Sequence, residues 1–135
     1  MRFLAKYEPH AYLLLRLVFG FLFACHGVQK LFAAELLHGP HMAAGFNPGF
    51  IGSVIELVAG ALIFIGLFTR IAAFIASGEM AVAYFMAHDH SAMAVQHGHA
   101  SFFPIVNGGE LAVIYCFVAL LIATHGAGGF AIDRK

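Results

Sequence analysis

Four apolar stretches dominate this chain of 135 residues, and each is close to the length of a membrane-spanning helix. They cover about residues 11–32, 50–68, 71–87 and 105–123. A helix needs about 20 apolar residues to cross a bilayer, and only a helix satisfies all its backbone hydrogen bonds within one such stretch. With 61% hydrophobic and 10% charged residues, the chain is not a soluble domain. The sequence predicts an all-α, integral membrane four-helix bundle that forms a single domain over residues 1–135.

The lysines and arginines outside these stretches predict the orientation of the bundle. They lie before the first stretch, between the second and third, or after the fourth: Arg2, Lys6, Arg70, Arg134 and Lys135. The two longer connections, residues 33–49 and 88–104, contain neither lysine nor arginine. Since cytoplasmic loops carry the positive charge, both termini should be cytoplasmic. The first stretch contains Arg16 and is too long for the apolar core of a signal peptide, so we expect it to remain as a helix.

Ionisable residues inside the apolar stretches predict a polar interior. In the first stretch, Arg16 and Lys30 share one helical face, with His26 beside them. A charged side chain that faces lipid costs several kcal/mol, so this face should turn toward acidic groups inside the bundle. The other three stretches supply those groups, one each: Glu56, Glu79 and Glu110.

Depth along each helix predicts which polar residues meet. With a rise of about 1.5 Å per residue, five of them should share the extracytoplasmic half of the bundle. We predict that these five form a ligand-binding cluster: His26, Lys30, Glu56, Asn107 and Glu110. Glu79 lies just below this level, and the long side chain of Arg16 could extend up to it. We expect these two residues to give the cluster electrostatic support from beneath.

A charge count suggests what such a cluster could bind. Arg16 and Lys30 stand against three carboxylates, so neutrality requires one further proton. A cluster that exchanges one proton suits a ligand that gains or loses protons on reduction, such as a quinone. Two other interpretations stay open. In an accessory or assembly subunit the ion pairs would only fix the order of the helices, and in a small-solute carrier they would line its path.

Four short motifs stand out along the chain. In the first half, an arginine followed by His-Gly-x-x-Lys stands at Arg16 and residues 26–30, and Glu-x-x-x-Gly followed by Gly-Leu-x-Thr-Arg stands at residues 56–60 and 66–70. In the second half, Asn-x-x-Glu stands at residues 107–110, and a glycine-rich ending before an aspartate stands at residues 126–133. In these four motifs the chain resembles the DoxX-like family. The resemblance implies a four-helix bacterial inner-membrane protein, related to the small quinone-linked subunit of thiosulfate:quinone oxidoreductase.

The resemblance and the charged cluster together predict a quinone-linked oxidoreductase subunit or partner embedded in the lipid bilayer. No redox centre is visible in the sequence, so any electron must come from a cofactor or another subunit, and whether the chain is itself an enzyme stays open. Its partners should be other membrane or redox subunits, or further copies of the chain. A formal net charge of zero gives no reason to expect nucleic acid.

Histidines in the longer connections raise the separate question of a metal site. Two close pairs follow the third apolar stretch: His88, His90, His97 and His99. Imidazoles at this spacing can bind zinc or copper, although histidine is also an ordinary polar loop residue. A heme would need axial histidines on facing helices, and only His26 lies deep enough, so we expect no heme. Cys25 and Cys116 form no C-x-x-C motif, and we expect no dithiol chemistry.

Overall fold

The computed structural model describes residues 2–32, 45, 47–88 and 101–133, and within these residues it contains helices and no strand. Its elements are α1 (Arg2–Ala5), α2 (Glu8–Phe32), α3 (Pro48–Ile65), α4 (Thr69–Ala83), the π-helical turn η1 (Tyr84–His88), α6 (Pro104–Asn107) and α7 (Glu110–His125). The prediction of an all-α protein is confirmed.

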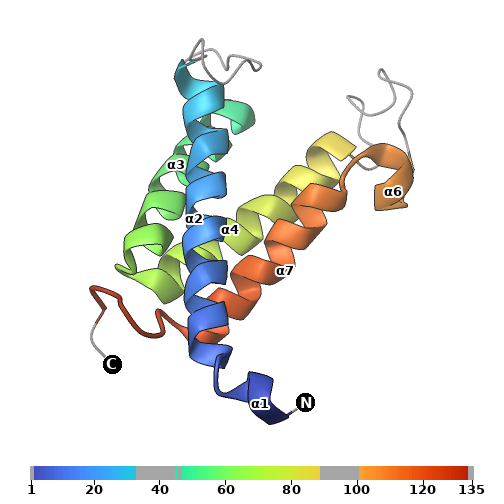
Figure 1. Cartoon of the computed structure of the whole chain (residues 1–135). Helices are drawn as coiled ribbons and strands as arrows, with labels where there is room; N and C mark the ends of the chain where they lie inside the picture. The colour runs from blue at the N-terminus through green and yellow to red at the C-terminus, as the bar shows by residue number, and fades with distance from the viewer. Residues whose placement is uncertain (1, 33–44, 46, 89–100, 134–135) are drawn as a thin grey trace.

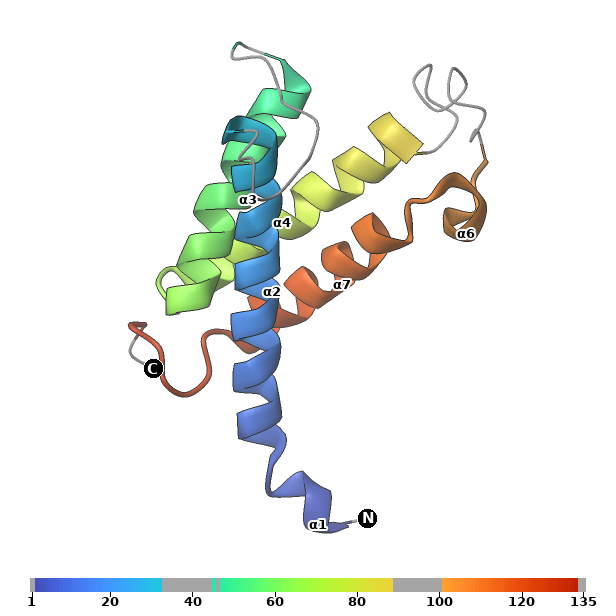
Figure 2. The same cartoon turned by 45° about the horizontal axis from the view of Figure 1, so that its top comes forward.

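Two helical hairpins form the bundle (Figure 1). α2 packs mainly on α3 and α4 mainly on α7, while a tight turn at residues 66–68 joins α3 to α4. The hairpins lie close together where α2 begins and α7 ends, and they diverge toward the opposite end (Figure 2). We call the first end the base and the opposite end the rim. The helices alternate in direction, so α2 and α4 run toward the rim and α3 and α7 run toward the base.

The lengths of the helices suit a membrane. α2, α3 and the continuous helix of α4 and η1 are each long and apolar enough to cross a bilayer. α7 is apolar but has 16 residues. That is about 24 Å of helix against a hydrocarbon core of about 30 Å, a mismatch that local thinning of the bilayer accommodates.

Large apolar side chains cover the outside of the helices. Those that are more than half exposed include Leu14, Phe21, Phe74 and Phe117. An apolar surface this extensive belongs against lipid, because water would drive it to associate. The interior is also apolar, with the rings of Phe19 and Phe23 edge-on to Tyr115 at 5.4 and 5.8 Å between centroids. The helical membrane bundle that the sequence predicts is confirmed.

Local sequence explains where α3 begins and ends. The side chain of Asn47 accepts the backbone N–H of Phe50 at 2.8 Å, and Pro48 occupies the first turn, where its missing N–H is not needed. Gly66 ends the helix with a φ of 72°, a left-handed conformation that glycine adopts without steric cost. These two signals hold α3 to 18 residues.

The fourth apolar stretch folds differently from its prediction as a single helix over 105–123. Gly108 takes a φ of 73° and separates the short α6 from α7, which begins at Glu110 and continues to His125. The break leaves Asn107 at the end of one helix and Glu110 at the start of the next. This matters for the site, because the prediction placed both residues at the start of one continuous helix.

Candidate functional site

Glycines bring α2 and α3 into direct backbone contact near the rim. A Cβ on Gly27 would lie 2.5 Å from the backbone nitrogen of Leu57, and one on Gly60 would lie 2.4 Å from that of Ala24. Both distances are below any real contact, so only glycine permits this approach. The close crossing also sets the distance between two polar residues that lie near it, Lys30 on α2 and Glu56 on α3.

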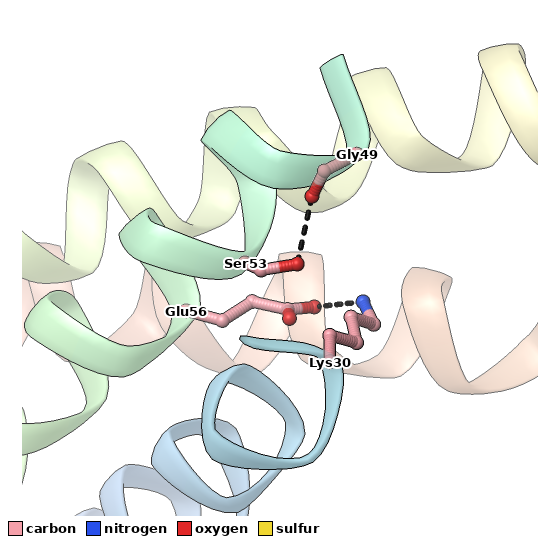
Figure 3. Close-up of polar contacts among 4 residues, drawn as sticks. All are labelled: Lys30, Gly49, Ser53 and Glu56. Atoms are coloured by element: carbon pink, nitrogen blue, oxygen red, sulfur yellow. Dashed lines mark hydrogen bonds and ion pairs between the residues drawn. The ribbon is translucent and has the colours of Figure 1, made fainter. Parts of the chain in front are cut away.

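Lys30 and Glu56 form a salt bridge between the two helices (Figure 3). The distance from Lys30 Nζ to Glu56 Oε1 is 2.7 Å. The Glu56 side chain is 3% exposed, whereas that of Lys30 is 28% exposed, so the pair is reached from the lysine side. Ser53, one turn before Glu56, donates its hydroxyl to the Gly49 carbonyl at 2.7 Å and not to the carboxylate. The pairing of Lys30 with Glu56 agrees with the predicted meeting of acids and bases.

Glu79 of α4 lies beside this pair. A Cβ on Gly52 would be 3.0 Å from Glu79 Oε1, and Gly52 stands one helical turn before Glu56 on α3. The second oxygens of both carboxylates, Glu56 Oε2 and Glu79 Oε2, are buried and have no hydrogen-bond partner among the described residues. We call Lys30, Glu56 and Glu79 the rim cluster. It sets two carboxylates against one ammonium group, so it is neutral only when it holds one more proton or another cationic group.

His26 lies one turn before Lys30, at the edge of the rim cluster. Its ring is half-buried and meets the ring of Tyr115 edge-on, with 5.8 Å between centroids. This contact turns the imidazole toward α7.

Asn107 and Glu110 do not join these residues, and the predicted convergence of all four helices is wrong. The amide of Asn107 donates to the Ser101 carbonyl at 2.6 Å and to the Tyr84 hydroxyl at 3.2 Å. Its side-chain oxygen accepts the Gly109 N–H, and Glu110 is exposed at the start of α7. The break at Gly108 and the divergence of the hairpins together keep both residues on the α4–α7 side of the rim.

Arg16 is also placed differently from its predicted position beneath Glu79. Its side chain is 1% exposed, but it is directed toward the base, where it donates to the carbonyls of Ala127 and Phe130. The support role toward Glu79 is therefore wrong. Backbone carbonyls beyond α7 accept from both terminal nitrogens of the guanidinium group, while its buried Nε has no hydrogen-bond partner among the described residues.

The base carries a second polar network that the charge argument missed. Its members are Tyr12, Arg16, Arg70 and Asp133, and we call it the base network. Together they tie the end of α7 and residues 126–133 to the other helices. Tyr12 donates to the Gly126 carbonyl, and Arg70 donates to the carbonyls of Ala123, Thr124 and His125 at the end of α7. Asp133 accepts the backbone N–H groups of Phe68 and Thr69, each at 2.8 Å. The signal available in the sequence was the glycine-rich ending before an aspartate, and α4 lacks any capping side chain of its own.

The metal prediction falls mostly outside the described residues. His90, His97 and His99 are not among them, whereas His88 is at the end of η1, with Nδ1 3.2 Å from the Asn107 carbonyl oxygen. Within the described ranges, no three histidine, cysteine, aspartate or glutamate side chains gather closely enough to hold a metal ion. The zinc or copper site stays a prediction.

Comparison with known proteins agrees with the motifs. Residues 11–89 match the DoxX family. The chain is also 41% identical over 136 residues to an uncharacterized protein of Haemophilus influenzae, in a match that covers 100% of this chain and 97% of the relative. No solved structure matches it. Together with the apolar helices, these matches show that the chain is a multi-pass membrane protein that belongs to the DoxX family.

Proposed function

We propose that this protein binds a quinone-like redox ligand beside Lys30 and works as a membrane subunit or partner of an oxidoreductase in the bacterial inner membrane. One observation carries the proposal: Glu56 is buried, Lys30 holds one of its oxygens, and the other oxygen has no partner among the described residues. A buried acceptor without a donor costs about 1–3 kcal/mol, so such an atom is more often found where a ligand or a proton satisfies it.

The donors and acceptors of the rim cluster fit a quinone. The Lys30 ammonium group has three N–H donors and uses one on Glu56 among the described residues, which leaves donors for a carbonyl oxygen. Glu56 would orient that ammonium group through the salt bridge. Lys30 is exposed enough to be reached, while Glu56 is not. A bound quinone would supply the redox chemistry, and these residues would bind it and exchange protons with it.

The charge balance of the rim cluster supports a role in proton exchange. Glu56 and Glu79 share a single ammonium group among the described residues, so one carboxyl group should carry a proton in the resting protein. That proton would be held next to the site where a reduced ligand needs one. Because Arg16 is directed to the base, it does not supply the missing positive charge.

A second function is favoured by the same salt bridge. Lys30 and Glu56 connect α2 to α3 at the crossing that Gly27 and Gly60 make possible, which is where a purely structural pair would also be placed. In that case the protein would be an accessory subunit whose polar cluster fixes its own helices. The two functions differ in whether any ligand stabilises the protein.

The test is a ligand-dependent thermal shift on purified protein in lipid nanodiscs. Short-chain ubiquinone and menaquinone analogues are titrated into the wild type, Lys30→Met, and Lys6→Met as a matched control at an exposed lysine. At about 100 times the Kd, a bound quinone should stabilise the folded state by about 2.7 kcal/mol. We expect this shift in the wild type and in Lys6→Met, and its loss in Lys30→Met. If neither quinone class raises the melting temperature of the wild type, and Lys30→Met melts at a lower temperature than the wild type, the ligand site is rejected. The salt bridge would then have only a structural role.

A further inference from the structure

The base of the bundle carries a pocket and a groove that meet at Arg70, and from them we infer a binding site for an anionic phospholipid. The phosphate would lie at Arg70 and His125, and an acyl chain would lie between α4 and α7. The site is at the opposite end of the bundle from the rim cluster and does not depend on the proposed quinone. The site would bind one class of lipid at a defined place, whereas the rest of the apolar surface contacts the bilayer without such selectivity.

The pocket at the base has both polar and apolar walls and is open on one side. It has a volume of about 620 Å³ and is lined by Phe68, Arg70, His125, Gly126, Gly128 and Asp133, among others. These residues belong to the turn before α4, the first turn of α4, the last residue of α7 and the chain after it, so the pocket lies at the base, where these apolar helices begin or end. This is the depth at which lipid headgroups are found.

The groove continues from the pocket along the lipid-facing side of the α4–α7 hairpin. Its volume is about 390 Å³, and its lining is Arg70, Ile71, Phe74, Leu120, Ala123 and Thr124. Arg70 and Ile71 line both spaces, so the groove adjoins the pocket. Apart from Arg70 and Thr124 the groove is apolar. A partly polar cavity at the base that adjoins an apolar groove matches the two ends of a phospholipid.

Arg70 gives the pocket its preference for an anion. Three of the five guanidinium N–H donors go to carbonyls at the end of α7, namely those of Ala123, Thr124 and His125. The side chain stays exposed, so the remaining donors can reach a phosphate oxygen. Those three hydrogen bonds also hold the guanidinium group in one orientation before a lipid arrives, which lowers the entropy cost of binding.

The other polar groups of the pocket do not oppose an anion. The carboxylate of Asp133 is directed to the backbone N–H groups of Phe68 and Thr69, so the positive end of α4 offsets its charge. The ring of His125 is held against the ring of Tyr12, with 3.8 Å between centroids, and can donate to a phosphate. A free phosphate ion would use the same polar groups, but it would leave the apolar groove without a role.

Native mass spectrometry of the protein released from nanodiscs can test the site. Nanodiscs contain equal amounts of phosphatidylglycerol and phosphatidylcholine with identical acyl chains, and glycerol phosphate is added in a separate arm as the headgroup alone. We expect wild-type protein to retain phosphatidylglycerol about fivefold over phosphatidylcholine, the preference that one arginine near a membrane surface gives. Arg70→Gln should remove this preference. Thr124→Phe, which fills the groove and keeps Arg70, should lower retention of both lipids about fivefold, and Ala61→Phe at an exposed position of α3 should change neither.

The variants remain informative even if Arg70→Gln weakens the fold, because Thr124→Phe tests the groove at an exposed residue with every donor in place. Equal retention of both lipids by the wild type would overturn the inference. So would equal losses in Ala61→Phe and Thr124→Phe, since the groove would then have no special role. Displacement of phosphatidylglycerol by an equal concentration of glycerol phosphate would point to a free anion and reject the lipid.

Discussion

The carboxylate of Asp133 accepts the backbone N–H of Thr69 at 2.8 Å, so a residue beyond α7 closes the first turn of α4. The residue that precedes this helix, Phe68, has a φ of 49° and no capping side-chain oxygen. Asp133 takes the place of the missing cap and also accepts the Phe68 N–H at 2.8 Å. In this way residues 126–133 join the two hairpins at the base.

Asp133→Ala should destabilise the bundle by about 1 kcal/mol, the usual cost of losing an N-terminal cap. The Thr69 N–H holds the pKa of Asp133 below its ordinary value of 3.8. A depressed pKa means that the stabilisation is complete above that ordinary value and is lost as the pH falls through the lower, folded-state value. Thermal denaturation in detergent between pH 7 and pH 3 measures both effects. The variant should lose less stability than the wild type over the acid range, and parallel curves would contradict the assignment.

Lys30→Met should destabilise the protein by about 3 kcal/mol, because it leaves the buried Glu56 carboxylate without its cation. Adding Glu56→Gln to the same chain should restore part of that loss, since the uncompensated charge is then gone. A double-mutant cycle by chemical denaturation gives the coupling energy. Additive losses in the double variant would mean that the two side chains do not interact in the folded protein.

Gly60→Ala should disrupt the crossing of α2 and α3. The added Cβ would lie 2.4 Å from the backbone nitrogen of Ala24, and a backbone cannot move aside as a flexible side chain can. We expect a loss of about 2 kcal/mol or more, in the range for overpacked cores. Gly78→Ala is the matched control, because a Cβ there meets no atom within 4 Å.

Gly78→Ala should leave the melting temperature unchanged or raise it slightly, since alanine stabilises a helix interior by about 0.5–1 kcal/mol relative to glycine. Melting temperatures of both variants, measured side by side, make the comparison. A drop of similar size in each would attribute the effect to helix composition and not to the contact between α2 and α3.

Arg16→Met should release residues 126–133 from the base. Its guanidinium group donates to the carbonyls of Ala127 and Phe130, and the side chain is buried, so the substitution removes two hydrogen bonds at once. Hydrogen exchange measured by mass spectrometry should become faster in residues 126–133 and stay unchanged at the crossing of α2 and α3. Lys6→Met serves as the control for a lost positive charge near the same end. Faster exchange near Glu79 instead would restore the support role that the sequence suggests for Arg16.

Physical constraints that act along one helix were enough to predict much of this structure. The lengths of the apolar stretches predict the helical membrane bundle, because lipid leaves the backbone no other hydrogen-bond partners. The meeting of Lys30 with an acid from the second stretch follows from the cost of leaving either group in hydrocarbon. Both conclusions need only the sequence of the stretch and the nature of the solvent.

Constraints that depend on a break or on distant backbone were not predictable in the same way. A single left-handed glycine, Gly108, separates Asn107 from Glu110 and removes both from the rim cluster. The partners of Arg16 are backbone carbonyls, which every residue carries, so no side chain in the sequence marks them. The charge count that included Arg16 and Glu110 therefore overstated the cluster, although the shortfall of one positive charge persists in the smaller group.

The cap that Asp133 provides has a consequence for biosynthesis. Asp133 emerges from the ribosome after all of α7, so α4 must enter the membrane with its amino end uncapped. The α2–α3 hairpin can be assembled as soon as it is inserted. The α4–α7 hairpin can be completed only after residues 126–133 have reached the turn at residues 66–68. The order of synthesis thus places the capping of α4 after the synthesis of α7.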